Sequence, residues 1–167
     1  MSEARTIRPA TPEDTSVILR FIRELAEYER EPDAVEATEP MLREALFPAA
    51  SSGRGPYAEC VVAELDGAAV GMALFFHNFS TWTGRAGVYL EDLYVTPEAR
   101  GRGVGRALLR RLAQIAVERG CARLEWSVLD WNEPALGFYR AISAVPMTEW
   151  TVHRLDGGAL RAMAEGG

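Results

Sequence analysis

The chain has 167 residues, a formal net charge of −6 at pH 7, and 48% hydrophobic against 25% charged residues. These values are typical of one globular domain, spanning 1–167, with a core of its own. The acidic balance argues against a nucleic-acid partner, and no apolar run reaches the roughly 20 residues that cross a bilayer. The opening residues lack the apolar stretch of a signal peptide, so we expect a cytoplasmic protein.

The first half of the chain predicts a strand, two helices and a hairpin. Thr11-Pro12 supplies an N-cap and a first-turn proline, and the apolar residues that follow have helical spacing. Asp66-Gly67 is typical of a tight turn between two strands. In chain order we expect a strand over 5–9, helices over 11–28 and 38–46, and strands over 57–65 and 68–77.

The second half predicts alternating strands and helices. Gly120 ends the longest predicted helix, and Asn132 is a good N-cap for the next one. In chain order we expect a strand over 87–95, a helix over 103–119, a strand over 122–129, a helix over 133–142, a strand over 146–155 and a helix over 158–164. This order predicts an α/β (α+β) fold with a mixed sheet, antiparallel at its start, and helices on both faces.

Cysteine and histidine are scarce. Cys60 and Cys121 are far apart in the chain and show no metal-ligand spacing, so we interpret them as buried small hydrophobes rather than a disulfide, and expect no metal. His77 and His153 are the two histidines, which leaves a hydrolase triad poorly supplied.

Charge is segregated along the chain. Seven acids and one base lie between Glu24 and Glu39, whereas five arginines and no acid lie between Arg100 and Arg111. Either stretch alone is typical of a solvated helix face. Together, on one small domain, they suit an anionic cofactor and a cationic substrate.

A glycine-rich and arginine-rich loop, 100–105, lies between the strand 87–95 and the helix that follows. Such a loop exposes main-chain N–H groups at a helix N-terminus, where the helix dipole favours a phosphate group. A Rossmann fingerprint fails, because Arg106 stands at the third glycine position, and no Gly-Lys-Ser/Thr of a P-loop follows. Glu91-Asp92 in the preceding strand places a candidate base close to this loop.

Several motifs together resemble the GNAT superfamily of N-acetyltransferases, and most closely its diamine/polyamine (spermidine/spermine) and thialysine branch. The likeness runs from about Arg5 to Ala164. It is carried by Ile7-Arg8-Pro9-Ala10, Glu24-Leu25-Ala26-x-Tyr28-Glu29, Tyr89-Leu90-Glu91-Asp92-Leu93, Arg100-Gly-x-Gly-x-Gly105 and Trp131-Asn132-Glu133-Pro134-x-x-x-Phe138-Tyr139. The chain departs from the pattern at Ser143, where such enzymes usually carry glycine, and in a shorter 144–150 segment.

The resemblance implies a central sheet of about six to seven strands and acetyl-CoA as co-substrate. The pyrophosphate of acetyl-CoA would be held by main-chain N–H groups and arginine side chains of the loop, which comprises Arg100, Gly101, Arg102, Gly103, Val104, Gly105 and Arg106. Its pantetheine arm would bond to the main chain at Leu93, Tyr94 and Val95, with Asn132, Glu133, Pro134 and Ala135 on its other side.

The implied reaction is direct acetyl transfer to a primary amine. An alkylamine has a pKa of about 10.4, so it arrives protonated and a base must take its proton. Glu91 is the candidate base, acting through water, and its alternative is an ordinary exposed strand acid. Tyr139 is the candidate general acid for the thiolate, and its alternative is simple packing beside Phe138. Asp92 is expected to point to the opposite face as a structural residue.

By the same resemblance, the acceptor amine lies against Tyr28, Glu29 and Glu91, with Glu125, Trp126 and Ser127 at its border. We expect a small cationic amine, with a polyamine and a thialysine-like amino acid both open, and a homodimer formed through the last strand. A protein or peptide N-acetyltransferase and a non-catalytic acyl-CoA sensor are the alternatives.

Overall fold

The computed structural model describes residues 5–166, in two compact units that divide between Ser127 and Val128. The first unit contains a five-stranded sheet in the order β1-β2-β3-β4-β5. Its strands are β1 (Arg5–Pro9), β2 (Glu59–Leu65), β3 (Ala68–Ser80), β4 (Arg85–Val95) and β5 (Leu124–Trp126). The first three pairings are antiparallel and β4 pairs with β5 in parallel, which confirms the predicted mixed sheet.

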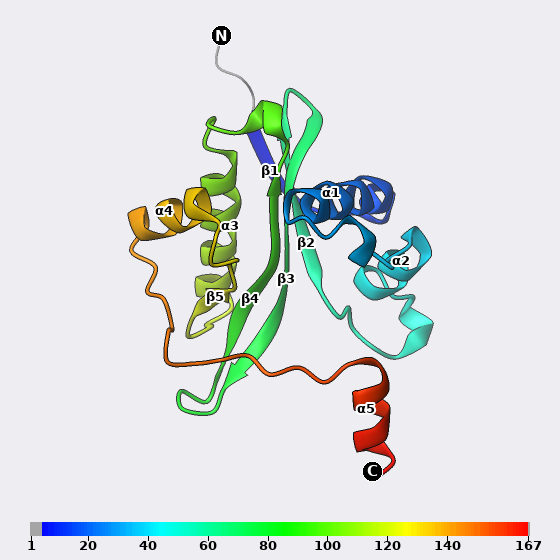
Figure 1. Ribbon diagram of the computed structural model, residues 1–167. Helices are drawn as coiled ribbons and strands as arrows, with labels where there is room; N and C mark the ends of the chain where they lie inside the picture. The colour runs from blue at the N-terminus through cyan, green and yellow to red at the C-terminus, as the bar shows by residue number, and fades with distance from the viewer. Residues whose placement is uncertain (1–4, 167) are drawn as a thin grey trace. The chain divides into compact units, whose positions relative to one another are not determined.

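Helices cover both faces of this sheet, as predicted. α1 (Thr15–Tyr28) and α2 (Glu39–Leu46) lie on one face and α3 (Val104–Glu118) lies on the other (Figure 1). Short 3₁₀ helices cover Pro12–Asp14, Pro32–Ala34, Ala50–Ser52 and Pro97–Ala99. Across residues 5–166, every helix is too short or too polar to traverse a bilayer.

The start of α1 is fixed by a charged network. Both guanidinium Nη atoms of Arg8 donate to the Asp14 carboxylate at 2.7 and 2.9 Å, and Arg8 Nε donates to Glu64 on β2 at 2.8 Å. The Thr11 main-chain N–H also donates to Asp14 Oδ2 at 2.7 Å. Asp14 is buried, and its pKa falls to about 2 because Arg8 and Thr11 stabilise the carboxylate.

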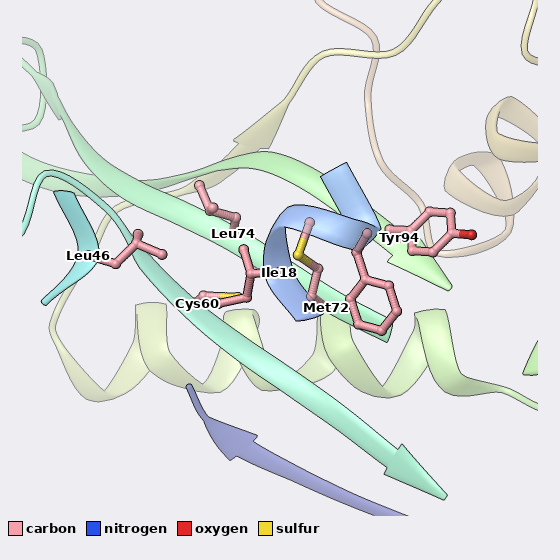
Figure 2. Close-up of a cluster of buried hydrophobic side chains, with 7 residues drawn as sticks. Ile18, Leu46, Cys60, Met72, Leu74 and Tyr94 are labelled. Carbon is pink, nitrogen blue, oxygen red and sulfur yellow. The ribbon is translucent and has the colours of Figure 1, made fainter. Parts of the chain in front are cut away.

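The apolar core between α1, α2 and the sheet contains seven buried side chains. It comprises Ile18, Phe21, Leu46, Cys60, Met72, Leu74 and Tyr94. Figure 2 shows Ile18, Cys60, Met72 and Leu74 converging from the helix and the strands. Cys60 is a free thiol whose pKa burial raises to about 12, in line with its interpretation as a buried hydrophobe.

β4 carries a bulge at Glu91. Leu74 of β3 pairs with Asp92 and the next residue, Phe75, pairs with Leu90, so Glu91 has no partner on β3. The pairing of β4 with β5 stops at the same point, since its last pair joins Leu90 and Trp126. The extra residue bends β4 and increases its twist where the two parallel strands part.

The second unit contains α4 (Glu133–Ala141) and α5 (Gly157–Ala164). The prediction of a strand over 146–155 is wrong, because this segment has no regular secondary structure. Its apolar side chains lie in solvent, with Met147 62%, Trp150 69% and Val152 82% exposed. A strand requires a neighbouring strand to pair with, and none of residues 5–166 pairs with this segment, so the sheet has five strands rather than the expected six to seven.

Candidate active site

The loop before α3 has the geometry of an anion-binding turn. Gly101 and Gly103 both adopt left-handed conformations, with φ of 73° and 76°, which glycine reaches at little cost. Gly103 is the N-cap of α3 and provides no side-chain cap, and the first turn of the helix contains no acid. The first N–H groups of a helix have no intrahelical acceptor, so this turn suits a phosphate group. The Val104 side chain is buried, and only its main chain can take part.

The arginines of this loop, Arg100, Arg102 and Arg106, are all exposed, and Arg100 also contacts the strand before it and the end of α1. Arg100 Nε donates to the Val95 carbonyl at 3.0 Å, and its guanidinium lies 5.3 Å from the Tyr28 ring centre and 6.0 Å from that of Tyr94. Arg100 therefore ties the loop to the end of α1, a contact that the sequence did not indicate. Arg102 and Arg106 are exposed, as is suitable for ion pairing with a bound anion.

Leu93, Tyr94 and Val95 form the part of β4 that lies beyond its pairing with β5. On the β3 side they pair with Ala73, Met72 and Gly71. On the β5 side, no strand within residues 5–166 pairs with them, which leaves an edge to which an extended ligand can add. The buried Tyr94 side chain donates its hydroxyl to Glu24 Oε2 at 2.7 Å.

Three carboxylates lie close together where α1 ends and β4 bulges. Glu29 is the C-cap of α1, Glu91 is the exposed bulge residue, and Asp92 follows it; we call these three the carboxylate cluster. The pKa of Asp92 rises to about 6, first because Asp92 is desolvated and then because Glu91 and Glu29 are negatively charged nearby. Burial also raises the pKa of Glu29. No other described residue forms an ion pair or side-chain hydrogen bond with any of the three.

Asp92 was expected to be structural and to point away from Glu91. The bulge breaks the simple alternation of side chains on which that expectation depended, and the charge of Glu91 contributes to the raised pKa of Asp92. The adjacency of Glu91 and Asp92 in the sequence was the one signal that their charges would interact. The bulge itself depends on the register of β3, which the β4 segment alone does not reveal.

A second group of side chains comes from β3, β4 and the β5 region, away from the carboxylate cluster. Phe76 and Tyr89 stack at 5.1 Å, and the Tyr89 hydroxyl lies 2.7 Å from Ser127 Oγ. Glu125 Oε2 accepts from Asn78 Nδ2 at 2.9 Å and lies 2.9 Å from Arg123 Nε. The negative charge of Glu125 is therefore paired with the positive charge of Arg123. Trp126 is half-buried and pairs with Leu90.

The remaining predicted residues belong to the second unit. Asn132 caps α4, with Oδ1 accepting the Ala135 N–H at 3.3 Å, and Pro134 lies in the first turn. Glu133 is exposed and pairs with Arg140 at 3.3 Å. Tyr139 is half-buried on α4 beside Phe138, with ring centres 5.5 Å apart, and burial raises its pKa.

Ser143, just after α4, keeps the left-handed conformation that the family pattern assigns to glycine, with φ of 63°. The turn is held by main-chain bonds: the Ser143 N–H donates to the Arg140 carbonyl at 3.0 Å and the Ala144 N–H to the Tyr139 carbonyl at 3.1 Å. Among residues 5–166 there is no group of three or more His, Cys, Asp or Glu side chains arranged to hold a metal.

Comparisons with known proteins agree with this geometry. Residues 20–143 match the acetyltransferase (GNAT) family. A thialysine N-epsilon-acetyltransferase from Bos taurus is 41% identical over 95% of this chain and 96% of its own length. A spermidine/spermine N(1)-acetyltransferase-like protein from Homo sapiens is 33% identical over 95% of this chain and 23% of its own length. An integron cassette protein from the mobile metagenome of V. cholerae has the same fold, with a TM-score of 0.79, 25% identity and coverage of 98% of this chain and 99% of that one.

Proposed function

We propose, given that the chain belongs to the GNAT family of acetyltransferases, that this N-acetyltransferase moves an acetyl group from acetyl-CoA to the primary amine of a small cationic acceptor. The observation that carries the proposal is the carboxylate cluster, two of whose acids, Glu91 and Asp92, lie on the strand that leads into the anion-binding turn. Three neighbouring acids attract a cationic amine, and the turn attracts an anionic cofactor. The acceptors named for the relatives, thialysine and spermidine or spermine, are of this kind.

The residues of the turn fit the diphosphate of acetyl-CoA. Two left-handed glycines and an uncapped helix N-terminus supply main-chain donors, and the exposed Arg102 and Arg106 supply charge. The edge of β4 at Leu93 to Val95 supplies main-chain groups for the pantetheine arm. When bound, the cofactor supplies an activated acetyl thioester. By family resemblance, Asn132 to Ala135 also contact it.

Glu91 takes the proton from the acceptor ammonium, through a water molecule. Its place on a bulge keeps the carboxylate exposed, and the neighbouring Asp92 and Glu29 hold the ammonium close by charge attraction. Asp92 joins Glu29, Glu91 and Tyr28 in binding the acceptor. Tyr139 donates its phenolic proton to the departing thiolate, a role consistent with a pKa that burial keeps above its ordinary value.

An assay of CoA release with purified protein and acetyl-CoA tests the function directly. The panel contains thialysine, spermidine, an aminoglycoside and a basic peptide. We expect release with a small amine and a loss of roughly a hundredfold in kcat for Glu91→Gln, because general base catalysis contributes about that much. Release with the peptide alone would replace the small-molecule acceptor by a protein. Tight acetyl-CoA binding without release for any amine would make the chain a sensor and refute the proposal.

We also propose that the chain forms a homodimer through the segment 146–155 and that its two units work as one domain. The apolar side chains of that segment are exposed in the single chain, which favours burial against a second copy. Light scattering should then report twice the 18.4 kDa of the chain. A monomeric mass at micromolar concentration would exclude the dimer.

A further inference from the structure

We infer that the ion pair of Arg123 and Glu125 binds the α-carboxylate and α-ammonium of an amino-acid acceptor whose side-chain amine is acetylated. The inference depends on the proposed function and names its substrate class. It commits to an ω-amino α-amino acid, such as thialysine, over a polyamine. Four observations in the first unit support it.

The two charged groups lie on one face of the sheet. Asn78 bonds Glu125, Glu125 pairs with Arg123, and Tyr89 bonds Ser127, so strands β3, β4 and β5 present these side chains together. Residues two apart on a strand share a face, so Asn78 and Phe76 lie on the same face of β3 as Leu74. Leu74 belongs to the core beside α1, so this is the face that α1 covers. This is also the face on which Asp92 pairs with Leu74.

The spacing fits an extended amino-acid side chain. Tyr89 is the strand partner of Glu125, and Glu91 lies two residues further along β4. Two strand residues rise roughly 6–7 Å. An extended chain of five single bonds, as between the side-chain amine and Cα of thialysine, has about the same reach. An acceptor with its amine at Glu91 therefore brings its α-carbon level with Glu125.

Charge and polarity along this path match such a molecule in order. The carboxylate cluster lies at one end, the stacked rings of Phe76 and Tyr89 lie in between, and one positive and one negative group lie at the other end. Aromatic rings suit a methylene chain or a thioether sulfur. A polyamine would place a second cation at a site of zero net charge, whereas an α-amino acid places a carboxylate and an ammonium there.

Both partners of the ion pair have bonding capacity to spare. Arg123 uses Nε for Glu125, and its two Nη atoms have no other described partner. Glu125 uses Oε2 for both Asn78 and Arg123, and its Oε1 has no other described partner. The side chains are 40% and 34% exposed, so a ligand can reach them without breaking the pair.

The decisive measurement compares two acceptors that differ in the head group alone. Thialysine and 2-(ethylthio)ethylamine carry the same amine and thioether, but the latter has no carboxylate or α-ammonium. Wild-type protein should show a kcat/KM roughly ten- to a hundredfold higher for thialysine, the size of a charge-assisted pair of contacts. Equal values, or a preference for the simple amine, would overturn the inference without a mutant. No turnover of either amine would instead contradict the proposed function.

Variants then locate the effect. Arg123→Gln should raise KM for thialysine about tenfold or more and lower the preference between the two acceptors by the same factor. Arg123→Lys keeps a positive charge and should retain part of the preference. Arg111→Gln is the matched control, because Arg111 is a half-buried arginine paired with Glu118 on α3, and it should leave the preference intact. If Arg123→Gln lowered kcat/KM equally for both acceptors, Arg123 would be a structural residue and the inference would fail.

Discussion

At the scale of single residues, the charge state of Asp92 connects the proposed acceptor binding with stability. Its pKa is about 6 in the folded chain against 3.8 for an ordinary aspartate. Because the folded pKa is the higher one, the folded state binds more protons between these values. The free energy of unfolding should therefore fall as pH rises from about 4 to 6, by on the order of 2 kcal/mol from this group.

Asp92→Asn should remove that part of the pH dependence, which urea unfolding at a series of pH values would measure. The comparison must be made as a difference from wild type, because Asp14 changes stability in the opposite direction at lower pH. The same variant should raise KM for the acceptor at pH 8, where wild-type Asp92 is charged. A pH profile of stability identical to that of wild type would show that Asp92 titrates normally.

The left-handed conformation of Ser143 could be expected from the glycine that the family pattern has at this position. Its cost in folding free energy can be measured. Its φ of 63° is unfavourable for a residue with a side chain. Ser143→Gly should raise the free energy of unfolding by about 0.5–1 kcal/mol, since the strain relieved exceeds the added entropy of the unfolded chain. Ala141→Gly in the last turn of α4 is the control and should destabilise. A loss of stability in Ser143→Gly would mean that the turn changes shape.

Tyr139 is the proposed general acid of the reaction. Tyr139→Phe keeps the ring beside Phe138 and removes the proton donor. It should lower kcat by roughly ten- to a thousandfold while leaving the dissociation constant of acetyl-CoA, measured by calorimetry, within about twofold. Turnover at the wild-type rate would show that Tyr139 only packs beside Phe138 and is not the general acid.

At the scale of elements, the start of α1 determines where its other end presents Tyr28 and Glu29. Asp14 receives both Nη donors of Arg8 and the Thr11 N–H. Asp14→Asn should lower the free energy of unfolding at pH 7 by about 2 kcal/mol, the usual cost of losing hydrogen bonds to a buried charge. Because its folded pKa is about 2, the wild-type advantage should disappear as pH falls from 3.8 towards 2. Chemical denaturation at pH 7 and pH 3 measures both effects, and an equal loss at both pH values would contradict the ion-pair explanation.

Local signals predicted most elements correctly, and the failures are non-local. Asp66-Gly67 determines its own turn, with φ of 48° and 82°, so the hairpin of β2 and β3 was readable from two residues. The bulge at Glu91 was not, because it results from how β3 pairs with β4. The segment 146–155 contains residues that favour a strand, such as Trp150, Thr151 and Val152, but composition cannot supply the neighbouring strand that a sheet requires.

At the scale of the whole molecule, the positive and negative stretches of the sequence form separate regions of the first unit. The turn with Arg102 and Arg106 and the carboxylate cluster both lie in the first unit, joined by one strand. The sequence predicted the turn because its glycines and arginines are contiguous. It could not predict the pairing of Glu125 with Asn78, whose residues are 47 positions apart.

This separation of charge predicts how salt changes catalysis. Raising ionic strength from about 0.01 to 0.15 M shortens the Debye length from roughly 30 to 8 Å, which screens exposed charges more than contacts at bonding distance. KM for a cationic acceptor should therefore rise with salt, and more for spermidine than for thialysine, because the amino acid has a lower net positive charge. The dissociation constant of acetyl-CoA should rise as well, since the arginines proposed to bind it are exposed. Initial rates at several concentrations of sodium chloride measure the first effect and calorimetry the second. If KM for spermidine did not change with salt, the carboxylate cluster would not be the site that attracts the amine.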